Sequence, residues 1–219
     1  STLLILQAGY AVTQNKLDQG FAAAQRGIAL ALASGNREGQ ATGRMVQAET
    51  HYRRAQYAEA QALNEQILEQ IRQHPPGAPR SEAHLDTEWR ALRWLGLIAA
   101  TLDDYAAAER YLGAGLALCR SLGKLRGEGI LLFELGRAAQ GQANYAAAEA
   151  HYQSALGLTP RVGYRGLESI LQFQLGDVLR LQGKYAQALA MMQQALASFR
   201  EIGEHMDEAT ALAYLGHLA

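Results

Sequence analysis

One passage of this sequence occurs three times at a fixed interval. The stretch "LGDVLRLQGKYAQALAMMQQAL" begins at Leu175, and the similar stretches "LGRAAQGQANYAAAEAHYQSAL" and "LGLIAATLDDYAAAERYLGAGL" begin at Leu135 and Leu95, so each copy lies 40 residues from the next. The Leu-Gly pair returns once more at Leu215. Self-similarity at a fixed period of this length is typical of proteins that stack copies of one supersecondary unit. The spacing therefore predicts a repeat protein.

Each repeat unit has the pattern of two helices. In "ESILQFQLGDVLRLQ" apolar residues recur at steps of three and four, which places them on one stripe of a helix: Ile170, Leu171, Leu175, Val178 and Leu179. After the turn "QGK", a second helical run extends from Tyr185 to Phe199, and Gly203 suits the left-handed residue that follows a helix end. Since no strand-like alternation of useful length occurs, we expect an all-α fold of helical hairpins.

Small residues recur where the two helices of a hairpin would cross. Gly176 and Ala188 have counterparts in the other copies, and a close helix crossing leaves room for little more than a hydrogen atom or a methyl group. A glycine, a tyrosine nine residues later and an alanine three residues after that resemble the tetratricopeptide repeat (TPR). The period of 40 exceeds the usual 34 and is similar to the long repeats in sensor domains of bacterial multidomain (STAND-type) regulators such as the maltose-regulon activator, in kinesin light chain and in peptide-sensing quorum regulators.

The resemblance implies a TPR-like α-solenoid of about five helical hairpins plus a partial sixth, wound as a right-handed superhelix. We expect residues 1–219 to form a single repeat domain with approximate units 1–36, 37–80, 81–124, 125–164 and 165–204 and a partial unit at 205–219. The partial unit is apolar at Leu212, Leu215 and Leu218, and a solenoid needs a polar outer face on its terminal repeats. We therefore expect a fragment of a larger protein and self-association through this uncapped end.

A proline-rich stretch interrupts the period between the second and third units. Three of the four prolines, Pro75, Pro76 and Pro79, lie in "IRQHPPGAPRSEAH", which predicts an extended loop. This loop is either a tolerated surface insertion or a partner-binding segment.

Composition argues against several classes of partner. A net charge of -1 gives no bulk field to attract nucleic acid or an anionic membrane, and no apolar run approaches the roughly 20 residues of a membrane span. The single cysteine, Cys119, cannot form an internal disulfide, so a cytoplasmic location is expected, with Cys119 as a buried small hydrophobic residue.

No pattern of catalytic or cofactor-binding residues is recognisable. The sequence contains no phosphate-binding loop, no dinucleotide fingerprint, no HExxH and no CxxC, and the six histidines lack metal-ligand spacing. The nearest cluster, His205 with Asp207 and Glu208, is best explained as solvated surface. We expect a protein without enzymatic activity, cofactor or metal.

The resemblance also implies which surface binds. In TPR proteins the first helices line an inner, concave wall, at positions six and three residues before the conserved glycine and one and four residues after it. Ten of the residues at these positions are the candidate site: Glu49, Tyr52, Arg90, Arg93, Phe133, Arg137, Gln140, Phe173, Asp177 and Arg180. Aromatic and arginine side chains most often dominate binding energy.

A structural role is the alternative for the same residues. Phe133 and Phe173 could be ordinary packing between repeats, and Arg137 and Arg180 could be solvated or paired with Glu134 or Asp177. The function that we expect is a scaffold for a protein or peptide segment, or for another domain of the same chain, in a bacterial signalling or transcription regulator. The alternative is a small-ligand-sensing domain of such a regulator.

Overall fold

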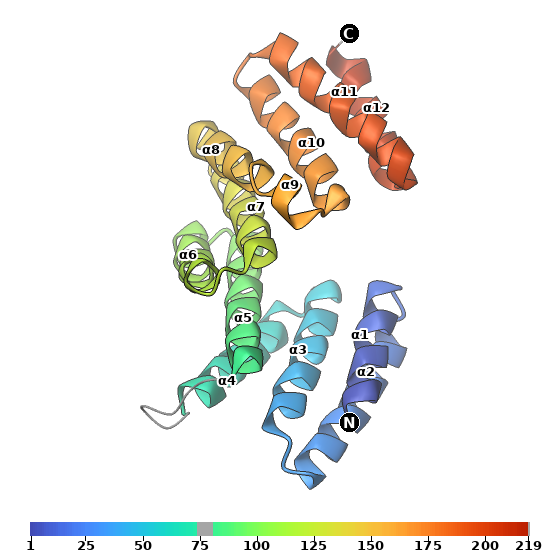
Figure 1. Cartoon of the computed structure of the whole chain (residues 1–219), viewed down its shortest axis with the longest axis vertical. Coiled ribbons are helices and arrows are strands. Elements are labelled where there is room, and N and C mark those ends of the chain that lie inside the picture. The colour runs from blue at the N-terminus through green and yellow to red at the C-terminus, as the bar shows by residue number, and fades with distance from the viewer. Residues whose placement is uncertain (74–80, 219) are drawn as a thin grey trace. The chain divides into compact units, whose positions relative to one another are not determined.

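A computed structural model describes residues 1–73 and 81–218, with the side chains of Met206, His217 and Leu218 excepted. Within these ranges the chain is all-α and contains no β-strand (Figure 1). The predicted loop from Pro75 to Pro79 and the side chain of Leu218 lie outside the described residues. None of the helices in the described part combines the length and the apolar character that a membrane crossing requires.

The chain divides into two compact units, Ser1–Leu118 and Cys119–Ala219, which are described separately. Unit 1 is formed by α1 (Thr2–Thr13), α2 (Leu17–Ala33), α3 (Arg37–Arg53), α4 (Tyr57–Arg72), α5 (Glu82–Thr101) and most of α6 (Tyr105–Ser121). From α1 to α5 each helix packs against the next one, and the first helices of successive hairpins also meet, α1 against α3 and α3 against α5. Unit 1 therefore consists of stacked helical hairpins.

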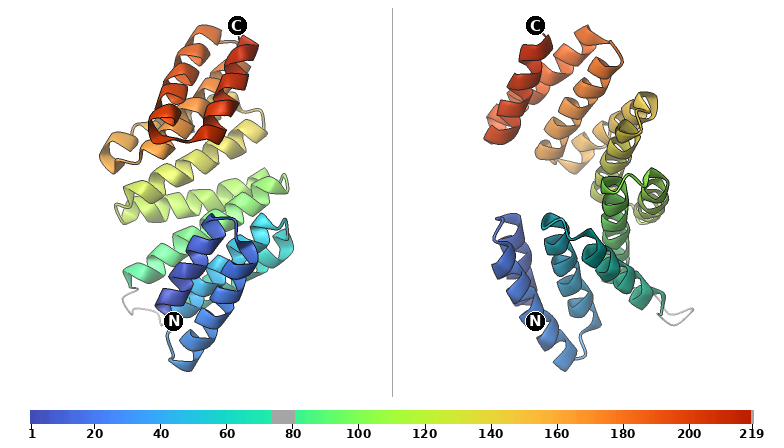
Figure 2. Two further views of the ribbon diagram at one scale, coloured as in Figure 1. Left: turned by 90° about the vertical axis from the view of Figure 1, so that its right-hand side faces the viewer. Right: turned by 180° about the vertical axis from the view of Figure 1, so that it is seen from behind.

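Unit 2 begins within the last turn of α6 and repeats this arrangement. It contains α7 (Leu125–Gly141), α8 (Tyr145–Leu156), α9 (Thr159–Val162), α10 (Arg165–Leu181), α11 (Tyr185–Ile202) and α12 (His205–Leu218). Two views show α10, α11 and α12 side by side, and α10 also contacts α8 (Figure 2). The repeat pattern did not predict that the second helix of the fourth hairpin ends at Leu156 and is followed by the short α9. Gly157 and Pro160 explain the break, since glycine is a poor helix former and proline lacks a backbone donor.

The small residues that recur in the repeats lie at the helix crossings, as predicted. A Cβ atom added at Gly96 would lie 2.5 Å from Cγ of Leu112, and one added at Gly176 would lie 2.8 Å from Cγ of Met192. Both distances are far shorter than ordinary carbon contacts of about 3.5–4.0 Å. The glycine therefore allows the large second-helix side chain to pack directly on the backbone of the first helix.

Residues with a left-handed backbone conformation (positive φ) lie in the turns that follow the helices. Gly203 has φ 76°, as expected for the residue after a helix end, and Gly123 and Gly163 occupy the same place in earlier hairpins. The turn inside each hairpin also needs one left-handed residue, and only Gly183 is a glycine; the others are Asn15, Ala55, Asp103 and Ala143. In these turns the backbone amide of the residue after the left-handed one donates to the carbonyl five residues before it, as from Asn144 to Ala139 at 2.9 Å.

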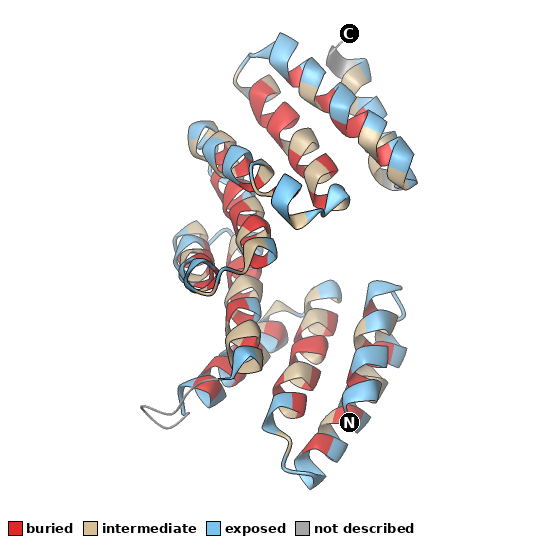
Figure 3. Ribbon diagram, in the orientation of Figure 1, coloured by how far each residue is buried: buried red, intermediate tan, exposed pale blue. Residues whose placement is uncertain are grey.

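Apolar clusters between the helices hold each unit together (Figure 3). One cluster of unit 1 joins Met45 of α3 and Ile67 of α4 to Leu95 of α5. A cluster of unit 2 joins Leu196 and Phe199 of α11 to Ala211 of α12. Cys119 is buried, as predicted.

Candidate binding wall on the first helices

The stripe of first-helix residues in unit 2 is called the unit 2 wall. It consists of Ile130, Phe133, Arg137 and Gln140 on α7 and of Ile170, Phe173, Asp177 and Arg180 on α10. Within each set the steps are three and four residues, so the four side chains share one face of their helix. All except the buried Asp177 keep some exposure to solvent.

A chain of hydrogen bonds joins the two helices of this wall. The side-chain amide of Gln140 donates to Oδ2 of Asp177 at 2.8 Å, and Oε1 of Gln140 accepts from the hydroxyl of Tyr152 at 3.0 Å. Burial raises the pKa of Tyr152 well above its ordinary value, so the phenol stays protonated and remains a donor. The amide of Gln140 is thereby fixed in one orientation between α8 and α10.

Asp177 also holds Arg180. Its Oδ1 accepts from Nε of Arg180 at 3.0 Å and from Nη2 at 2.7 Å, and Asp177 is only 8% exposed. The guanidinium group of Arg180 lies 5.7 Å from the ring of Tyr214 on α12. Arg180 thus adopts the paired arrangement that was the alternative to a binding role, and only part of its donor capacity remains available.

Arg137 is held much less firmly. Its Nη1 lies 3.4 Å from Oε2 of the buried Glu134, at the long limit for a hydrogen bond, while 55% of the Arg137 side chain is exposed. The guanidinium carbon lies 5.9 Å from the centre of the Phe133 ring. The half-buried Phe133 and the exposed Arg137 therefore form an aromatic and cationic pair that solvent reaches.

Both phenylalanines pack against neighbouring rings and remain half-buried. Phe133 lies 6.0 Å from Tyr152, and Phe173 meets Tyr214 edge to face at 5.2 Å. Each phenylalanine therefore packs against a neighbouring ring and still keeps part of its surface open to solvent.

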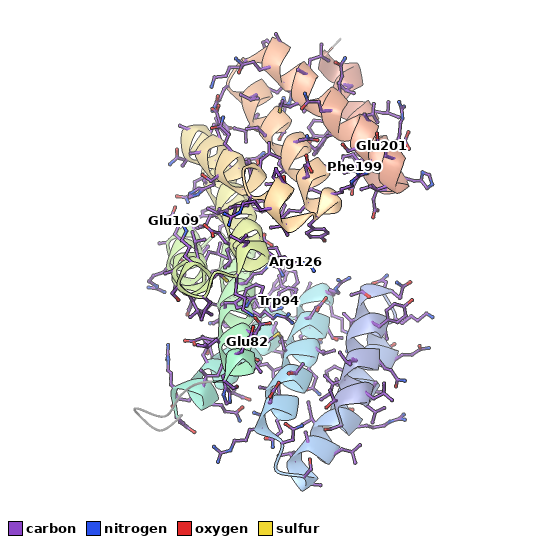
Figure 4. All side chains as sticks on the ribbon, in the orientation of Figure 1. Glu82, Trp94, Glu109, Arg126, Phe199 and Glu201 are labelled. Atoms are coloured by element: carbon purple, nitrogen blue, oxygen red, sulfur yellow. The ribbon has the colours of Figure 1, made fainter. Side chains whose placement is uncertain are left out.

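The predicted residues of unit 1 fall into two groups on α3 and α5. Tyr52 of α3 is within hydrogen-bond distance of Thr101 at 3.2 Å, and its ring lies 5.2 Å from Trp94 of α5. Arg93 lies 5.3 Å from the same Trp94 ring, which Figure 4 labels on α5.

The remaining two candidates of unit 1 form pairs within their own helix. Glu49 pairs with Arg53 at 3.0 Å, and Arg90 pairs with Asp86 at 3.3 Å and lies 5.5 Å from the ring of Trp89. Arg90 is exposed, and Glu49 is half-buried. These ion pairs near solvent contribute little to stability.

Two aromatic residues that contact candidate site residues, one in each unit, were not predicted from the sequence. Trp94 and Tyr214 stand two residues before Gly96 and Gly216, and each contacts the last wall residue of the preceding first helix, Tyr52 or Arg180. The sequence pattern that could have pointed to them is an aromatic residue two positions before the repeat glycine in two of the units. Glu134, at the same position in the fourth unit, instead contacts Arg137 of its own helix.

The histidine and acidic side chains of the described residues are dispersed. No group of three or more His, Cys, Asp or Glu side chains there could hold a metal ion. His205 and Glu208 approach to 3.6 Å at the start of α12, where 88% of the His205 side chain is exposed.

Comparison with known proteins identifies the repeat. A family model of the tetratricopeptide repeat matches residues 167–219, and no curated protein sequence matches the chain. The chain is similar to the solved structure of a Signal Transduction ATPase with Numerous Domains (STAND) protein with a tetratricopeptide repeat sensor from Pyrococcus horikoshii. The TM-score is 0.78 and the identity 17%, over 97% of this chain and 31% of that one.

Two further structures have comparable similarity. Aspartyl phosphate phosphatase F from Bacillus subtilis gives a TM-score of 0.79 at 13% identity, over 98% of this chain and 53% of that one. A Rap protein complexed with Competence and Sporulation Factor gives a TM-score of 0.78 at 14% identity, over 93% of this chain and 55% of that one. This chain therefore spans about a third to about half of the length of these relatives. Residues 167–219 are a tetratricopeptide repeat segment, and the chain has the TPR-like helical-repeat fold.

Proposed function

We propose that this chain is a non-enzymatic scaffold that binds a protein or peptide segment, or another domain of its own chain, on the first-helix wall. The observation that carries the proposal is the pair of the half-buried Phe133 and the exposed Arg137 in unit 2. The proposed setting is a bacterial signalling or transcription regulator in the cytoplasm, without direct contact to nucleic acid or membrane.

The wall has the chemistry that such binding needs. Half-buried phenylalanine rings offer apolar area that is already ordered, so a partner that covers them loses little conformational entropy of the scaffold. Arg137 offers guanidinium donors for carboxylates or backbone carbonyls. The hydrogen bond between Gln140 and Asp177 fixes the spacing of α7 and α10 before binding. The other candidate contacts are Phe173 and Arg180 in unit 2 and Glu49, Tyr52, Arg90 and Arg93 in unit 1.

The related folds agree with this proposal. The Rap protein was solved with Competence and Sporulation Factor, and the STAND protein carries its tetratricopeptide repeats as a sensor. At identities below 20% these structures support the fold, and a binding role for this chain is inferred by analogy.

Photo-crosslinking tests the proposal directly. Benzoylphenylalanine placed at position 133 is expected to crosslink a partner from a lysate of the source cells, at a segment that mass spectrometry can define. The same group at Gln193, an exposed residue of the second helix α11, serves as the matched control. Crosslinking of one segment from position 193 and not from position 133 would contradict a binding site on the wall.

A cavity in unit 1 favours small-ligand sensing as the second candidate function. It has a volume of about 500 Å³ and is lined by Arg37 and Gln40 of α3, Gln70 of α4 and His84 of α5, among others. This size and polarity suit a small polar molecule. A metabolite that raises the melting temperature of the wild type and not of Gln70→Leu would support sensing at this place.

We also propose self-association through the apolar face of α12. Leu212 is 45% exposed, while Leu215 packs partly against the cluster around Phe199. Light scattering after size-exclusion chromatography is expected to show a dimer that Leu212→Glu weakens. A wild-type chain that is monomeric at 100 μM, a concentration of the order at which weak interfaces associate, would contradict the proposal.

A further inference from the structure

The unit 2 wall continues one helical turn beyond its predicted residues. Arg126 lies four residues before Ile130 on α7 and therefore on the same face of the helix. The equivalent position on α10, four residues before Ile170, is Gly166, which has no side chain. The wall thus has an arginine on one helix and a vacant position on the other.

Tyr164 occupies the space beside these two positions. It follows the left-handed Gly163 directly, and a Cβ atom added at Gly166 would lie 3.5 Å from Cε2 of its ring. The guanidinium carbon of Arg126 lies 4.6 Å from the centre of the same ring. Figure 4 labels Arg126 at the start of α7. Tyr164 is 39% exposed as a residue, so it rests over Gly166 and still offers surface to solvent.

Two further arginines, Arg161 and Arg165, stand three residues before and one residue after Tyr164 in the chain. Within the part of the chain that the structure describes, neither the Arg126 nor the Arg161 side chain forms an ion pair, and both are exposed. Arg165 approaches Glu201 only to 3.9 Å, with 77% and 71% of the two side chains exposed. These three arginines with Tyr164 are called the Arg126 cluster. Unlike Arg180, which a buried carboxylate holds, they retain donors for an external anion.

We propose that the Arg126 cluster is the second anionic contact of the unit 2 wall, and that the partner is an acidic polypeptide segment with carboxylates on both sides of an apolar stretch. The inference rests on the proposed function. Arg137 stands at the other end of α7, and the floor between the two arginines is apolar, with Ile130 and Phe133. A phosphate backbone would need a continuous row of cations, so this pattern favours a polypeptide over nucleic acid.

The helix geometry sets the spacing of the acidic residues in the partner. Arg126 and Arg137 are eleven residues apart on α7, which corresponds to about 16 Å at 1.5 Å per residue. An extended chain covers this distance in about five residues at roughly 3.3 Å each. The partner segment therefore carries its two acidic groups about five residues apart.

A synthetic peptide series tests the proposal by fluorescence polarisation. The probe is the fluorescein-labelled octapeptide Glu-Glu-Leu-Phe-Leu-Leu-Glu-Glu, compared with versions in which one or both Glu-Glu pairs are replaced by Gln-Gln. Wild-type protein is expected to prefer the fully acidic peptide. Arg126→Ala is expected to weaken binding of the fully acidic peptide about tenfold. The same substitution is expected to change the affinity little for the peptide in which Gln-Gln replaces the acidic pair that meets the cluster. Arg110→Ala is the matched control, because Arg110 is also exposed and also stacks on a tyrosine, Tyr111, but lies on the second helix α6.

The outcomes separate this inference from the proposed function. Unchanged affinity of Arg126→Ala together with weaker binding by Phe133→Ala would overturn the role of the cluster and leave the wall as the binding site. A wild type that does not bind the acidic peptide, or that prefers the Gln version, would overturn the acidic partner. DNA binding is a further outcome: if an eight-nucleotide single-stranded DNA binds more tightly than the acidic peptide, the cluster is assigned to nucleic acid instead.

The relation between the cluster and the wall is tested by the two variants together. Weaker peptide binding by Arg126→Ala with unchanged binding by Phe133→Ala would show that the cluster acts apart from the wall and would contradict both proposals. Circular dichroism of each variant confirms that the fold is intact.

Discussion

Gln140 of α7 and Asp177 of α10 join two consecutive hairpins through one side-chain hydrogen bond of 2.8 Å. The same Asp177 carboxylate holds the guanidinium group of Arg180 on the other oxygen. A buried carboxylate that serves both helices links the stability of unit 2 to the geometry of its wall.

Replacement of Asp177 by alanine is expected to lower the free energy of unfolding by about 2 kcal/mol, because Gln140 and Arg180 lose their acceptor at a nearly buried place. Asp177→Asn keeps the shape and one acceptor oxygen, so a smaller loss is expected. Urea denaturation measures both. A change below about 0.5 kcal/mol for Asp177→Ala would show that the network is incidental.

Asn64 is expected to be a weak point of unit 1. It is fully buried, its amide donates to the carbonyl of Ala60 at 2.8 Å, and its Oδ1 has no hydrogen-bond partner. Leu112 and Met192 occupy the corresponding place in later hairpins. Asn64→Leu is therefore expected to raise the free energy of unfolding by about 1–2 kcal/mol, since it removes an unsatisfied buried acceptor.

Thermal and urea unfolding of Asn64→Leu check this expectation. Gln66→Leu, at an exposed position of the same helix, is the control and should leave stability unchanged within about 0.5 kcal/mol. A destabilised Asn64→Leu would mean that the amide makes a contact which the leucine cannot replace.

The turn between α7 and α8 stores backbone strain. Ala143 has φ 56°, in the left-handed region, where the equivalent residue of the next hairpin is Gly183. Ala143→Gly is expected to raise the free energy of unfolding by about 0.5–1 kcal/mol, because the relief of the left-handed alanine exceeds the added chain entropy of glycine. Ala150→Gly, at an exposed position within α8, should instead lose about 1 kcal/mol. Equal losses at both positions would disprove the strain.

Acid is expected to weaken a contact between the second helix of one hairpin and the turn of the next. The ammonium group of Lys184 donates to Oε2 of Glu149 at 3.0 Å, and this hydrogen bond lowers the pKa of Glu149. Because the folded-state pKa lies below the ordinary value of 4.5, the contribution is complete above that value and is lost as the pH falls through the lower one.

The free-energy difference between wild type and Glu149→Gln should therefore be largest near pH 7 and should shrink below pH 4.5. Glu201→Gln is the control, because its contact with Arg165 is long and solvent-exposed. A difference for Glu149→Gln that is constant from pH 7 to pH 3 would show that Lys184 does not favour the ionised carboxylate.

The hairpins were predictable because the constraint at each helix crossing is local and repeated. Gly96 and Gly176 can be read from their period alone, since any larger residue would collide with the second helix. The partners of the wall residues were not predictable in the same way. Whether Arg180 meets Asp177 or solvent depends on rotamers and on the register between α7 and α10, which a repeat pattern does not specify.

Features that break the repeat were the hardest to predict. The short α9 depends on Gly157 and Pro160, which have no counterpart in the other units. Tyr164 reaches the wall only because this break and the left-handed Gly163 place it beside Arg126. A residue that reaches a site from outside the repeat pattern needs the three-dimensional structure to be found.

The binding role of the wall is tested most directly by isothermal titration calorimetry. The partner segment defined by crosslinking is titrated into the Phe133→Ala variant, and the dissociation constant is measured. The wild type and Gln193→Ala, a variant on the exposed face of α11, are titrated in parallel. If the unit 2 wall is the binding site, Phe133→Ala weakens binding by about tenfold or more, and Gln193→Ala stays within about twofold of the wild type. Wild-type affinity for Phe133→Ala, with its circular dichroism unchanged, would contradict the assignment of binding to the wall.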